Sequence, residues 1–278
     1  MKILVTGANG YMGTGIVECL LNDGNEVIAA DFQTDGVDKR AKHMATNLFE
    51  VSDPFTHFGE PDVLLHLAWR DGFKHDSYNH IGDLPLHYTF ISKMIHSGIK
   101  RVCVLGTMHE VGFYEGSIDE NTSTAPQSLY GISKNALRDA IRLEADKNGT
   151  IFQWIRGFYI VGNTTAGCSI FSKITEAEGK GQKEFPFTTG VNQYDFLDYE
   201  EFCEQVAAVA EQQNINGIIN CCSGTPMRLG ERVEQFIREN NYKIKLKYGA
   251  FPDRAYDSKA VWGNDSKIRK IMENRKSI

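Results

Sequence analysis

The sequence has little that would place the protein in a membrane or on nucleic acid. No apolar run approaches the roughly 20 residues of a membrane span. The N-terminus reaches Gly7 before the apolar region of a signal peptide can form. Lys and Arg number 30 against 36 Asp and Glu, so the net charge is −6, and no long basic run occurs. We therefore expect no membrane and no nucleic-acid partner.

Metal-ligand spacing is also missing. The 6 cysteines form no CxxC pair, and the 8 histidines are not spaced with carboxylates as ligands. Most cysteines lie in apolar segments, where cysteine usually behaves as a small buried hydrophobic residue. We therefore expect no metal and a reducing, cytoplasmic location. With 41% hydrophobic and 24% charged residues, the 278-residue chain has the composition of an ordinary globular protein.

Short β-rich runs alternate with helical patterns along most of the chain. This alternation is typical of a parallel sheet with helices on both faces, so the predicted fold class is α/β, a Rossmann-like doubly wound parallel sheet. The predicted strands are Ile3–Val5, Val27–Ala30, Val63–Leu67, Val102–Leu105, Phe152–Ile155 and Ile218–Asn220. The predicted helices are Gly13–Asn22, residues 84–97, Ser133–Lys147, residues 200–212 and residues 230–240.

After Gly162 the rhythm changes to a Gly-, Lys- and Thr-rich stretch, which indicates a smaller, discontinuous C-terminal substrate lobe. Residues 206–220 still read as helix plus strand of the main sheet. The predicted division is therefore an NAD-binding domain of residues 1–162 and 196–222, and a substrate-binding lobe of residues 163–195 and 223–278. No internal repeat or low-complexity linker is visible.

A glycine-rich turn joins the first predicted strand to the first helix. Gly7 permits the tight turn, Gly10 lets the backbone approach a pyrophosphate, and Gly13 allows close packing of the helix. Asp31 ends the second strand, where a carboxylate accepts hydrogen bonds from an adenosine ribose and repels a 2′-phosphate. The motif predicts NAD as the cofactor, with Asn9, Tyr11 and Met12 completing the turn.

A second motif, Tyr130-Gly131-Ile132-Ser133-Lys134, begins a predicted helix. A separation of four places Tyr130 and Lys134 on one helical face. An ammonium group beside a phenol favours the phenolate, so Tyr130 can serve as a general acid or base. By itself the pattern is also compatible with two exposed side chains on a surface helix.

In order along the chain, the glycine turn, Asp31, His66-Leu67-Ala68, Thr107 and Tyr130 with Lys134 resemble the extended short-chain dehydrogenase/reductase family, especially its nucleotide-sugar epimerases, dehydratases and reductases. The likeness continues through residues 156–162 and 193–198 to the end of the chain. It implies Thr107 as the catalytic hydroxyl and Lys134 at the nicotinamide ribose. It also implies further cofactor contacts at Asn47, Leu48, Leu67, Ala68 and Trp69, and substrate contacts at Met108, Tyr159 and Arg254.

One departure from the family pattern concerns the reaction. Dehydratases of the family carry an acid pair directly after the catalytic Thr, whereas this chain has Met108 and His109, with Glu110 one position out of register. A dehydratase is therefore disfavoured. The unperturbed pKa of a histidine side chain, about 6.5, would suit His109 to proton exchange or to recognition of a carboxylate. A histidine that only shapes the loop is the alternative.

The resemblance implies an NAD-dependent oxidoreductase or epimerase acting by hydride transfer at a carbinol or keto carbon, on a nucleotide-diphosphate sugar. The segment 107–114 also resembles uronate dehydrogenases, so a dehydrogenase of a free sugar acid stays open, as does a non-catalytic NAD-binding sensor. We expect a homodimer joined through helix 133–147, with its apolar stripe, and the helix at 84–97. The stripe consists of Leu137, Ala140, Ile141 and Ala145.

Overall fold

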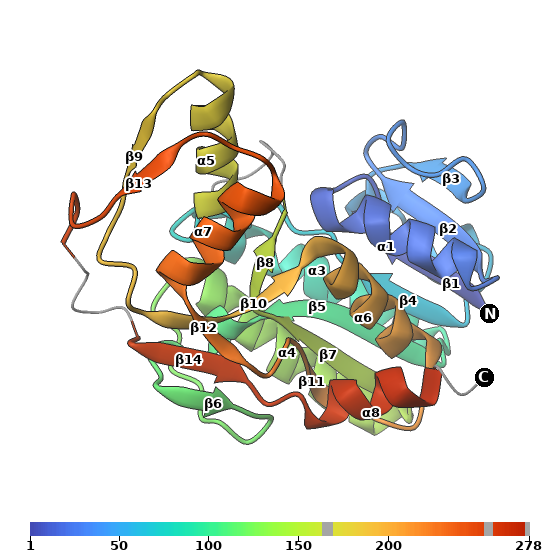
Figure 1. Cartoon of the computed structure of the whole chain (residues 1–278). Helices are drawn as coiled ribbons and strands as arrows, with labels where there is room; N and C mark the ends of the chain where they lie inside the picture. Colours follow the sequence, from blue (N-terminus) through green and yellow to red (C-terminus); the bar gives the residue numbers. More distant parts are fainter. Residues whose placement is uncertain (163–168, 253–257, 276–278) are drawn as a thin grey trace.

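The computed structural model describes residues 1–162, 169–252 and 258–275. A seven-stranded, wholly parallel sheet forms its centre, in the order β11-β7-β5-β4-β1-β2-β3 (Figure 1). Its strands are β1 (Lys2–Thr6), β2 (Glu26–Asp31), β3 (Lys42–Ala45), β4 (Val63–His66), β5 (Arg101–Thr107), β7 (Ile151–Gly157) and β11 (Gly217–Cys221).

The six predicted strands are all present in this sheet, because each carries a run of apolar residues that is buried on both faces. The seventh strand, β3, was not predicted. It lies at the sheet edge and exposes Lys42 and His43, so it lacks the apolar signal of a central strand.

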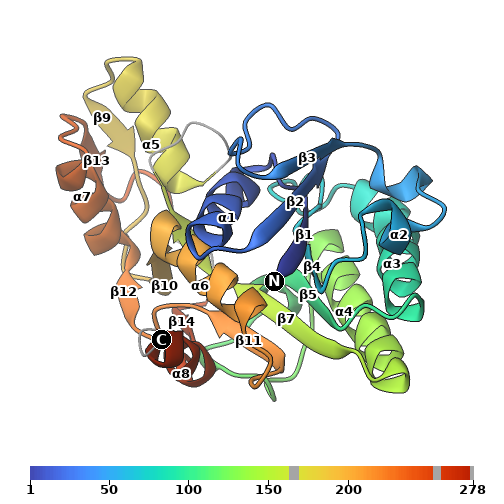
Figure 2. The same cartoon turned by 90° about the vertical axis from the view of Figure 1, so that its right-hand side faces the viewer.

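Helices cover both faces of the sheet. On one face lie α1 (Tyr11–Asn22), α6 (Tyr199–Glu211) and α8 (Ser266–Arg275), and on the other α3 (Asn79–His96) and α4 (Leu129–Asn148) (Figure 2). The short helices are α2 (Pro54–His57), η1 (Leu48–Glu50) and η2 (Met108–Glu110). The doubly wound α/β architecture predicted from the sequence is therefore confirmed. Helix α3 begins earlier than predicted and contains Pro85, a residue more common in a first turn.

The apolar stripe of α4 has a different role from the one predicted. Leu137, Ile141 and Ala145 are fully buried in the protein's own core, together with residues of β5 and β7 such as Val104 and Trp154. This stripe is therefore not available to join two copies, because the protein's own core already covers it, and the homodimer through this helix stays a prediction.

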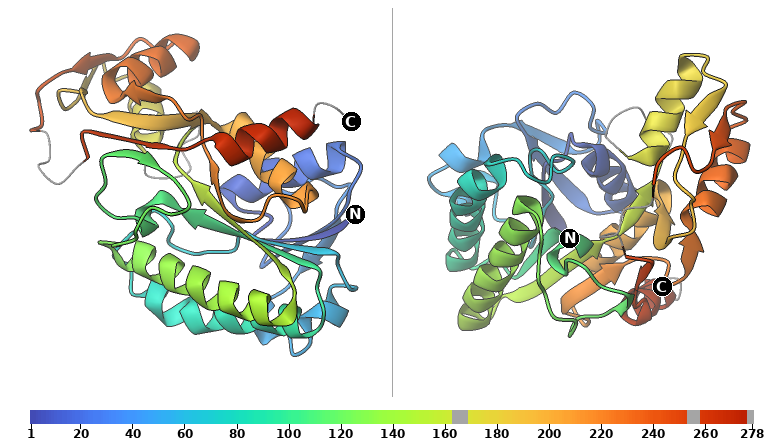
Figure 3. Two further views of the ribbon diagram at one scale, coloured as in Figure 1. Left: turned by 90° about the horizontal axis from the view of Figure 1, so that it is seen from below. Right: turned by 90° about the vertical axis from the view of Figure 1, so that its left-hand side faces the viewer.

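A second region is built from short strands and two helices beside the carboxyl ends of the main sheet (Figures 1 and 3). Its five-stranded sheet contains β12, β10, β14 and β6, with β8 paired to β10, and a two-stranded sheet joins β9 to β13. The bounds are β6 (Gly116–Ile118), β8 (Tyr159–Val161), β9 (Glu184–Pro186), β10 (Gln193–Asp198), β12 (Pro226–Arg228), β13 (Lys245–Lys247), β14 (Ala260–Gly263), α5 (Ile170–Gly179) and α7 (Leu229–Glu239). Strands β6 and β8 belong to the second region, although they precede residue 163 and so fall within the predicted NAD-binding domain. The predicted division into two units stays a prediction.

Among the described ranges, no helix combines the length and the apolar character that crossing a bilayer requires.

Candidate active site

The glycine-rich turn packs so tightly that side chains are excluded from it. Gly7 has a φ of 71°, and a Cβ there would lie 2.6 Å from the backbone nitrogen of Ala68. A Cβ on Gly13 would lie 2.2 Å from the carbonyl oxygen of Gly7. At the end of β2, Asp31 accepts a hydrogen bond from the backbone N–H of Asn9 at 3.0 Å. The turn, the N-terminus of α1 and the carboxylate therefore form one rigid unit at the switch point of the sheet.

Two cavities adjoin at this turn, since Gly7 and Trp69 line both. The larger, of about 620 Å³, is lined by the predicted residues Gly7, Gly10, Tyr11, Met12, Gly13, Leu67, Trp69, Thr107, His109, Tyr130, Lys134 and Tyr159. The smaller, of about 260 Å³, is lined by Gly7, Asp31, Asn47, Leu48, Ala68 and Trp69. An elongated site with a carboxylate at one end and Tyr130 with Lys134 in the other cavity fits a dinucleotide extended across the turn.

Two of the described predicted residues, Asn9 and Met108, do not line either cavity. The side chain of Asn9 accepts a hydrogen bond from Gly36 at 2.9 Å, and thereby braces the loop after β2. Met108 is buried in the apolar core. Arg254 lies outside the described residues.

Helix α4 places Tyr130 in its first turn and Lys134 in its second, because Ser128 caps the helix by accepting a hydrogen bond from the N–H of Gly131. Lys134 is buried. Its Nζ donates to the carbonyl oxygen of Leu105 at 2.7 Å and lies 4.0 Å from the centre of the Trp69 ring. Burial lowers the pKa of Lys134 to about 7, although the negative charge of Glu110 opposes this shift. The alternative that Tyr130 and Lys134 are two exposed side chains on a surface helix is therefore wrong.

Burial raises the pKa of Tyr130, whereas a hydrogen bond with the side chain of Thr107 acts in the opposite direction. The phenol is therefore protonated in this environment. The structure brings together a hydroxyl at the end of β5, a phenol and an amine with a pKa near neutrality, which is the set of groups that a proton transfer at a carbinol requires.

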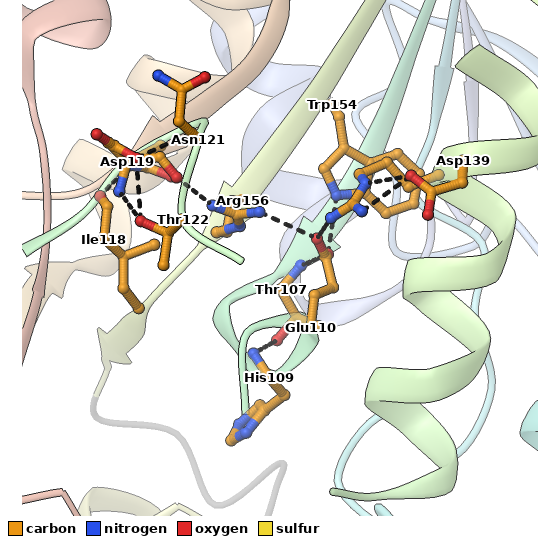
Figure 4. Close-up of polar contacts among 12 residues, drawn as sticks. Thr107, His109, Glu110, Ile118, Asp119, Asn121, Thr122, Asp139, Trp154 and Arg156 are labelled. Carbon is orange, nitrogen blue, oxygen red and sulfur yellow. Dashed lines mark hydrogen bonds and ion pairs between the residues drawn. The ribbon is translucent and has the colours of Figure 1, made fainter. Parts of the chain in front are cut away.

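Beneath Thr107 lies a buried carboxylate whose role the sequence reading missed. Glu110 Oε1 accepts hydrogen bonds from the backbone N–H of Thr107 at 2.7 Å and from Trp154 Nε1 at 2.8 Å (Figure 4). Its Oε2 lies 3.3 Å from Arg138 Nη1 and 3.5 Å from Arg156 Nη2. All five side chains are buried. Glu110 thus holds the loop that presents Thr107, rather than acting on a ligand.

A signal for this role was present in the sequence. Thr107-Met108-His109-Glu110 has the spacing of a capping box, and the structure contains both of its hydrogen bonds around η2. Arg138 and Arg156 could not be assigned to the same carboxylate, because they come from a helix and a strand far away in the chain.

His109 is half-buried and its ring centre lies 4.4 Å from that of His75. Burial, followed by the effect of His75, lowers the pKa of His109 to about 4. The imidazole is therefore neutral near pH 7, which suits hydrogen bonding to a hydroxyl better than pairing with a carboxylate. Within the described ranges, no group of three His, Cys, Asp or Glu side chains is placed to hold a metal ion.

The fold and the site together define a dinucleotide-binding α/β enzyme with a Thr-Tyr-Lys set of reactive groups. Residues 3–222 match the NAD dependent epimerase/dehydratase family. The chain belongs to this family.

Two curated relatives are similar in sequence. The dTDP-6-deoxy-L-talose 4-dehydrogenase (NAD(+)) of Aggregatibacter actinomycetemcomitans is 43% identical over 275 residues, which cover 95% of this chain and 99% of the relative. An uncharacterized UDP-glucose epimerase, YtcB of Bacillus subtilis (strain 168), is 24% identical over 78% of this chain and 75% of its own length.

Solved structures share the fold at low sequence identity. The UDP-N-acetylglucosamine 4-epimerase of Methanobrevibacter ruminantium M1 has a TM-score of 0.84 at 19% identity, covering 97% of this chain and 91% of that one. The UDP-glucose 4-epimerase of Thermus thermophilus, solved with NAD, has a TM-score of 0.80 at 19% identity, covering 99% and 93%. The predicted fold, family, NAD cofactor and NAD-dependent enzyme class are confirmed.

Proposed function

We propose that this protein oxidises C4 of dTDP-6-deoxy-L-talose with NAD⁺, in a reversible reaction that yields the 4-keto sugar. The observation that carries the proposal is the 43% identity to the dTDP-6-deoxy-L-talose 4-dehydrogenase over almost the whole of both chains. The broader class, an NAD-dependent enzyme that modifies nucleotide sugars, agrees with both curated relatives and with the solved neighbours.

In the proposed reaction Tyr130 exchanges the proton of O4, and Thr107 positions this oxygen. In the oxidation, the C4–H bond and the O4–H bond break and a C4=O double bond forms. NAD⁺, when bound, would supply the acceptor for the hydride from C4 and a positive charge that favours the phenolate form of Tyr130. Tyr130 takes the proton from O4, and Thr107, which hydrogen-bonds Tyr130, holds O4 in place. In the reduction Tyr130 returns the proton, for which its raised pKa is suited.

Lys134 provides positive charge next to this proton transfer. Its ammonium is anchored by the carbonyl of Leu105 and by the face of Trp69, so its position is defined by contacts on two sides. We infer that Lys134 also binds the nicotinamide ribose, and that Asp31 binds the adenosine ribose at the other end of the site. Both lie in the cavities that adjoin at Gly7.

The test is a direct assay of the purified protein with dTDP-6-deoxy-L-talose and NAD⁺. We expect NADH to appear in proportion to the 4-keto product, and NADP⁺ to be a poor substitute. An epimerase would convert the sugar without net NADH, and a uronate dehydrogenase would instead reduce NAD⁺ with a free sugar acid. Either result would contradict the proposal.

We further propose a cytoplasmic homodimer formed through the outer faces of α3 and α4. Exposed apolar side chains on these helices support it, namely Ile81 on α3 and Ile132 and Leu143 on α4. Sedimentation at micromolar concentration should show a dimer, and Leu143→Glu should shift it toward monomer. A single-chain species for the unmodified protein would contradict the dimer, and cell fractionation tests the location.

A further inference from the structure

The wall of the larger cavity contains a second histidine that the sequence reading did not connect with the site. His75 lies in the loop between β4 and α3 and lines the cavity. The loop is held in place, because the carbonyl of His75 accepts a hydrogen bond from the backbone N–H of Tyr130 at 2.9 Å. Asp71, in the same loop, accepts hydrogen bonds from Ser77 at 2.8 Å and Asn79 at 2.6 Å.

Three rings meet at this wall. The imidazole of His75 stacks on the ring of Tyr130, with ring centres 5.2 Å apart and planes inclined by 17°. The same imidazole meets His109 with ring centres 4.4 Å apart and an angle of 61°. His109 is itself 6.2 Å from the Tyr130 ring. Two imidazoles from different loops are thus placed directly beside the general acid/base.

No hydrogen bond joins either imidazole to another described residue, although both histidines line the cavity. Their neighbour His80 differs: it is bonded to Trp69 Nε1 at 3.0 Å and to the carbonyl of Lys74 at 3.0 Å. Partly buried polar atoms tend to be paired in a working site. The two histidines therefore have hydrogen-bonding capacity that the protein itself does not use.

We propose that His75 and His109 together bind the hydroxyl at C3 of the sugar, next to the reacting C4. The proposal rests on the proposed function for the identity of the sugar. C4 of a 6-deoxy hexose has two ring neighbours: C3, which carries a hydroxyl, and C5, which carries a methyl group. C5 also carries the ring oxygen, which can only accept a hydrogen bond, so only C3 offers a neighbouring group that both donates and accepts.

The charge state of the two rings agrees with a hydroxyl ligand. Burial lowers the pKa of both imidazoles, so each is neutral near pH 7 and offers one donor and one acceptor. A hydroxyl also has one donor and accepting lone pairs, so it can donate to one ring and accept from the other. His75 is thereby a specificity-determining residue for substrates with a free C3 hydroxyl.

Binding measured by calorimetry without NAD tests this independently of turnover. The ligands are dTDP-6-deoxy-L-talose and its 3-deoxy analogue, and the variants are His75→Phe, which keeps a stacking ring, and His75→Gln, which keeps a donor and an acceptor. We expect the natural protein to bind the analogue about ten-fold more weakly than the parent sugar. His75→Phe should bind the parent about ten-fold more weakly and distinguish the two sugars less than about two-fold.

His75→Gln should recover part of the discrimination, and His57→Phe, on exposed α2, should behave like the natural protein. Full discrimination by a folded His75→Phe protein would overturn the inference. If the natural protein binds the sugar with this dependence on His75 but does not reduce NAD⁺, the proposed function fails and the inference stands. If it oxidises the sugar and His75→Phe discriminates normally, only the inference fails. Absence of binding would overturn the inference, and absence of binding together with absence of NADH formation would overturn both.

Discussion

Two buried charges, Glu110 and Lys134, lie in the candidate active site, and their surroundings differ. Glu110 is fully buried and contacts four groups, the backbone N–H of Thr107, Trp154, Arg138 and Arg156. Lys134 is 2% exposed, and its ammonium group contacts two groups, the carbonyl oxygen of Leu105 and the face of the Trp69 ring. The carboxylate is compensated by two cations, whereas no described carboxylate forms an ion pair with the ammonium.

The difference separates a structural charge from a reactive one. A buried charge with several partners is rigid, and removal of one partner leaves the others unpaired. A buried charge with few partners loses hydration without full replacement, so its pKa moves toward neutrality and its proton becomes exchangeable. Glu110 therefore defines where Thr107 lies, and Lys134 has the properties expected of a group that takes part in the proposed proton transfer.

The largest expected effect is on the reactive side. Tyr130→Phe removes the proton donor and acceptor but keeps the ring that stacks with His75. Turnover should fall by about 10²–10⁴-fold, while NAD binding stays within a few-fold. Steady-state kinetics and calorimetric titration of NAD measure the two quantities. Tyr78→Phe, at an exposed tyrosine, is the matched control. Near-normal turnover of Tyr130→Phe would move the proton transfer to another group.

On the structural side, Glu110→Gln retains the shape of the side chain but removes the ion-pair partner that buried Arg156 has among the described residues, whereas Arg138 keeps its pair with Asp139. The free energy of unfolding should fall by about 3 kcal/mol. Denaturant unfolding measures it, and Glu176→Gln, which breaks the exposed pair with Lys180, should change it by less than about 1 kcal/mol. A Glu110→Gln protein as stable as the natural one would show that the four contacts of Glu110 contribute little.

Lys134→Met is expected to raise the free energy of unfolding, because it replaces a poorly compensated charge by an apolar side chain. The variant should be more stable by about 1–2 kcal/mol near pH 7, and inactive. The folded pKa of about 7 lies below the ordinary value of 10.5, so the unfolded chain binds more protons between these values. The stability of the natural protein therefore rises with pH across this window, and the advantage of the variant should shrink. Thermal unfolding at several pH values, with exposed Lys147→Met as control, tests this. A variant less stable than the natural protein would contradict it.

The last prediction concerns Asp31, which lines the smaller cavity and acts on cofactor affinity rather than on stability. Asp31→Ala removes the hydrogen bond to the backbone of Asn9 and would also remove the proposed ribose hydrogen bonds and the repulsion of a 2′-phosphate. NAD affinity should fall by about 1–3 kcal/mol, and the preference for NAD over NADP should narrow. Titration with both cofactors measures this, with exposed Asp35→Ala as the control. Equal affinity of the natural protein for both cofactors would contradict the role of Asp31.

Much of the fold was predictable, because the strands of a parallel sheet are continuous apolar runs separated by helical patterns. The same reasoning missed β3, whose polar edge residues carry no such signal. It also misjudged the stripe of Leu137, Ile141 and Ala145, since an apolar face indicates burial but not the surface that buries it. The glycine turn and the Tyr130–Lys134 spacing were readable because each depends on local geometry.

The sequence by itself determined the parts of this protein that depend on near neighbours: the tight turn at Gly7, the four-residue spacing of Tyr130 and Lys134, and the capping box from Thr107 to Glu110. Only the tertiary structure decided which distant groups meet them. Arg138 and Arg156 reach Glu110, Trp69 covers Lys134, and His75 stacks on Tyr130. The physical reason is that burial, charge compensation and pKa depend on every element packed around a group, and a local pattern contains no information about those elements.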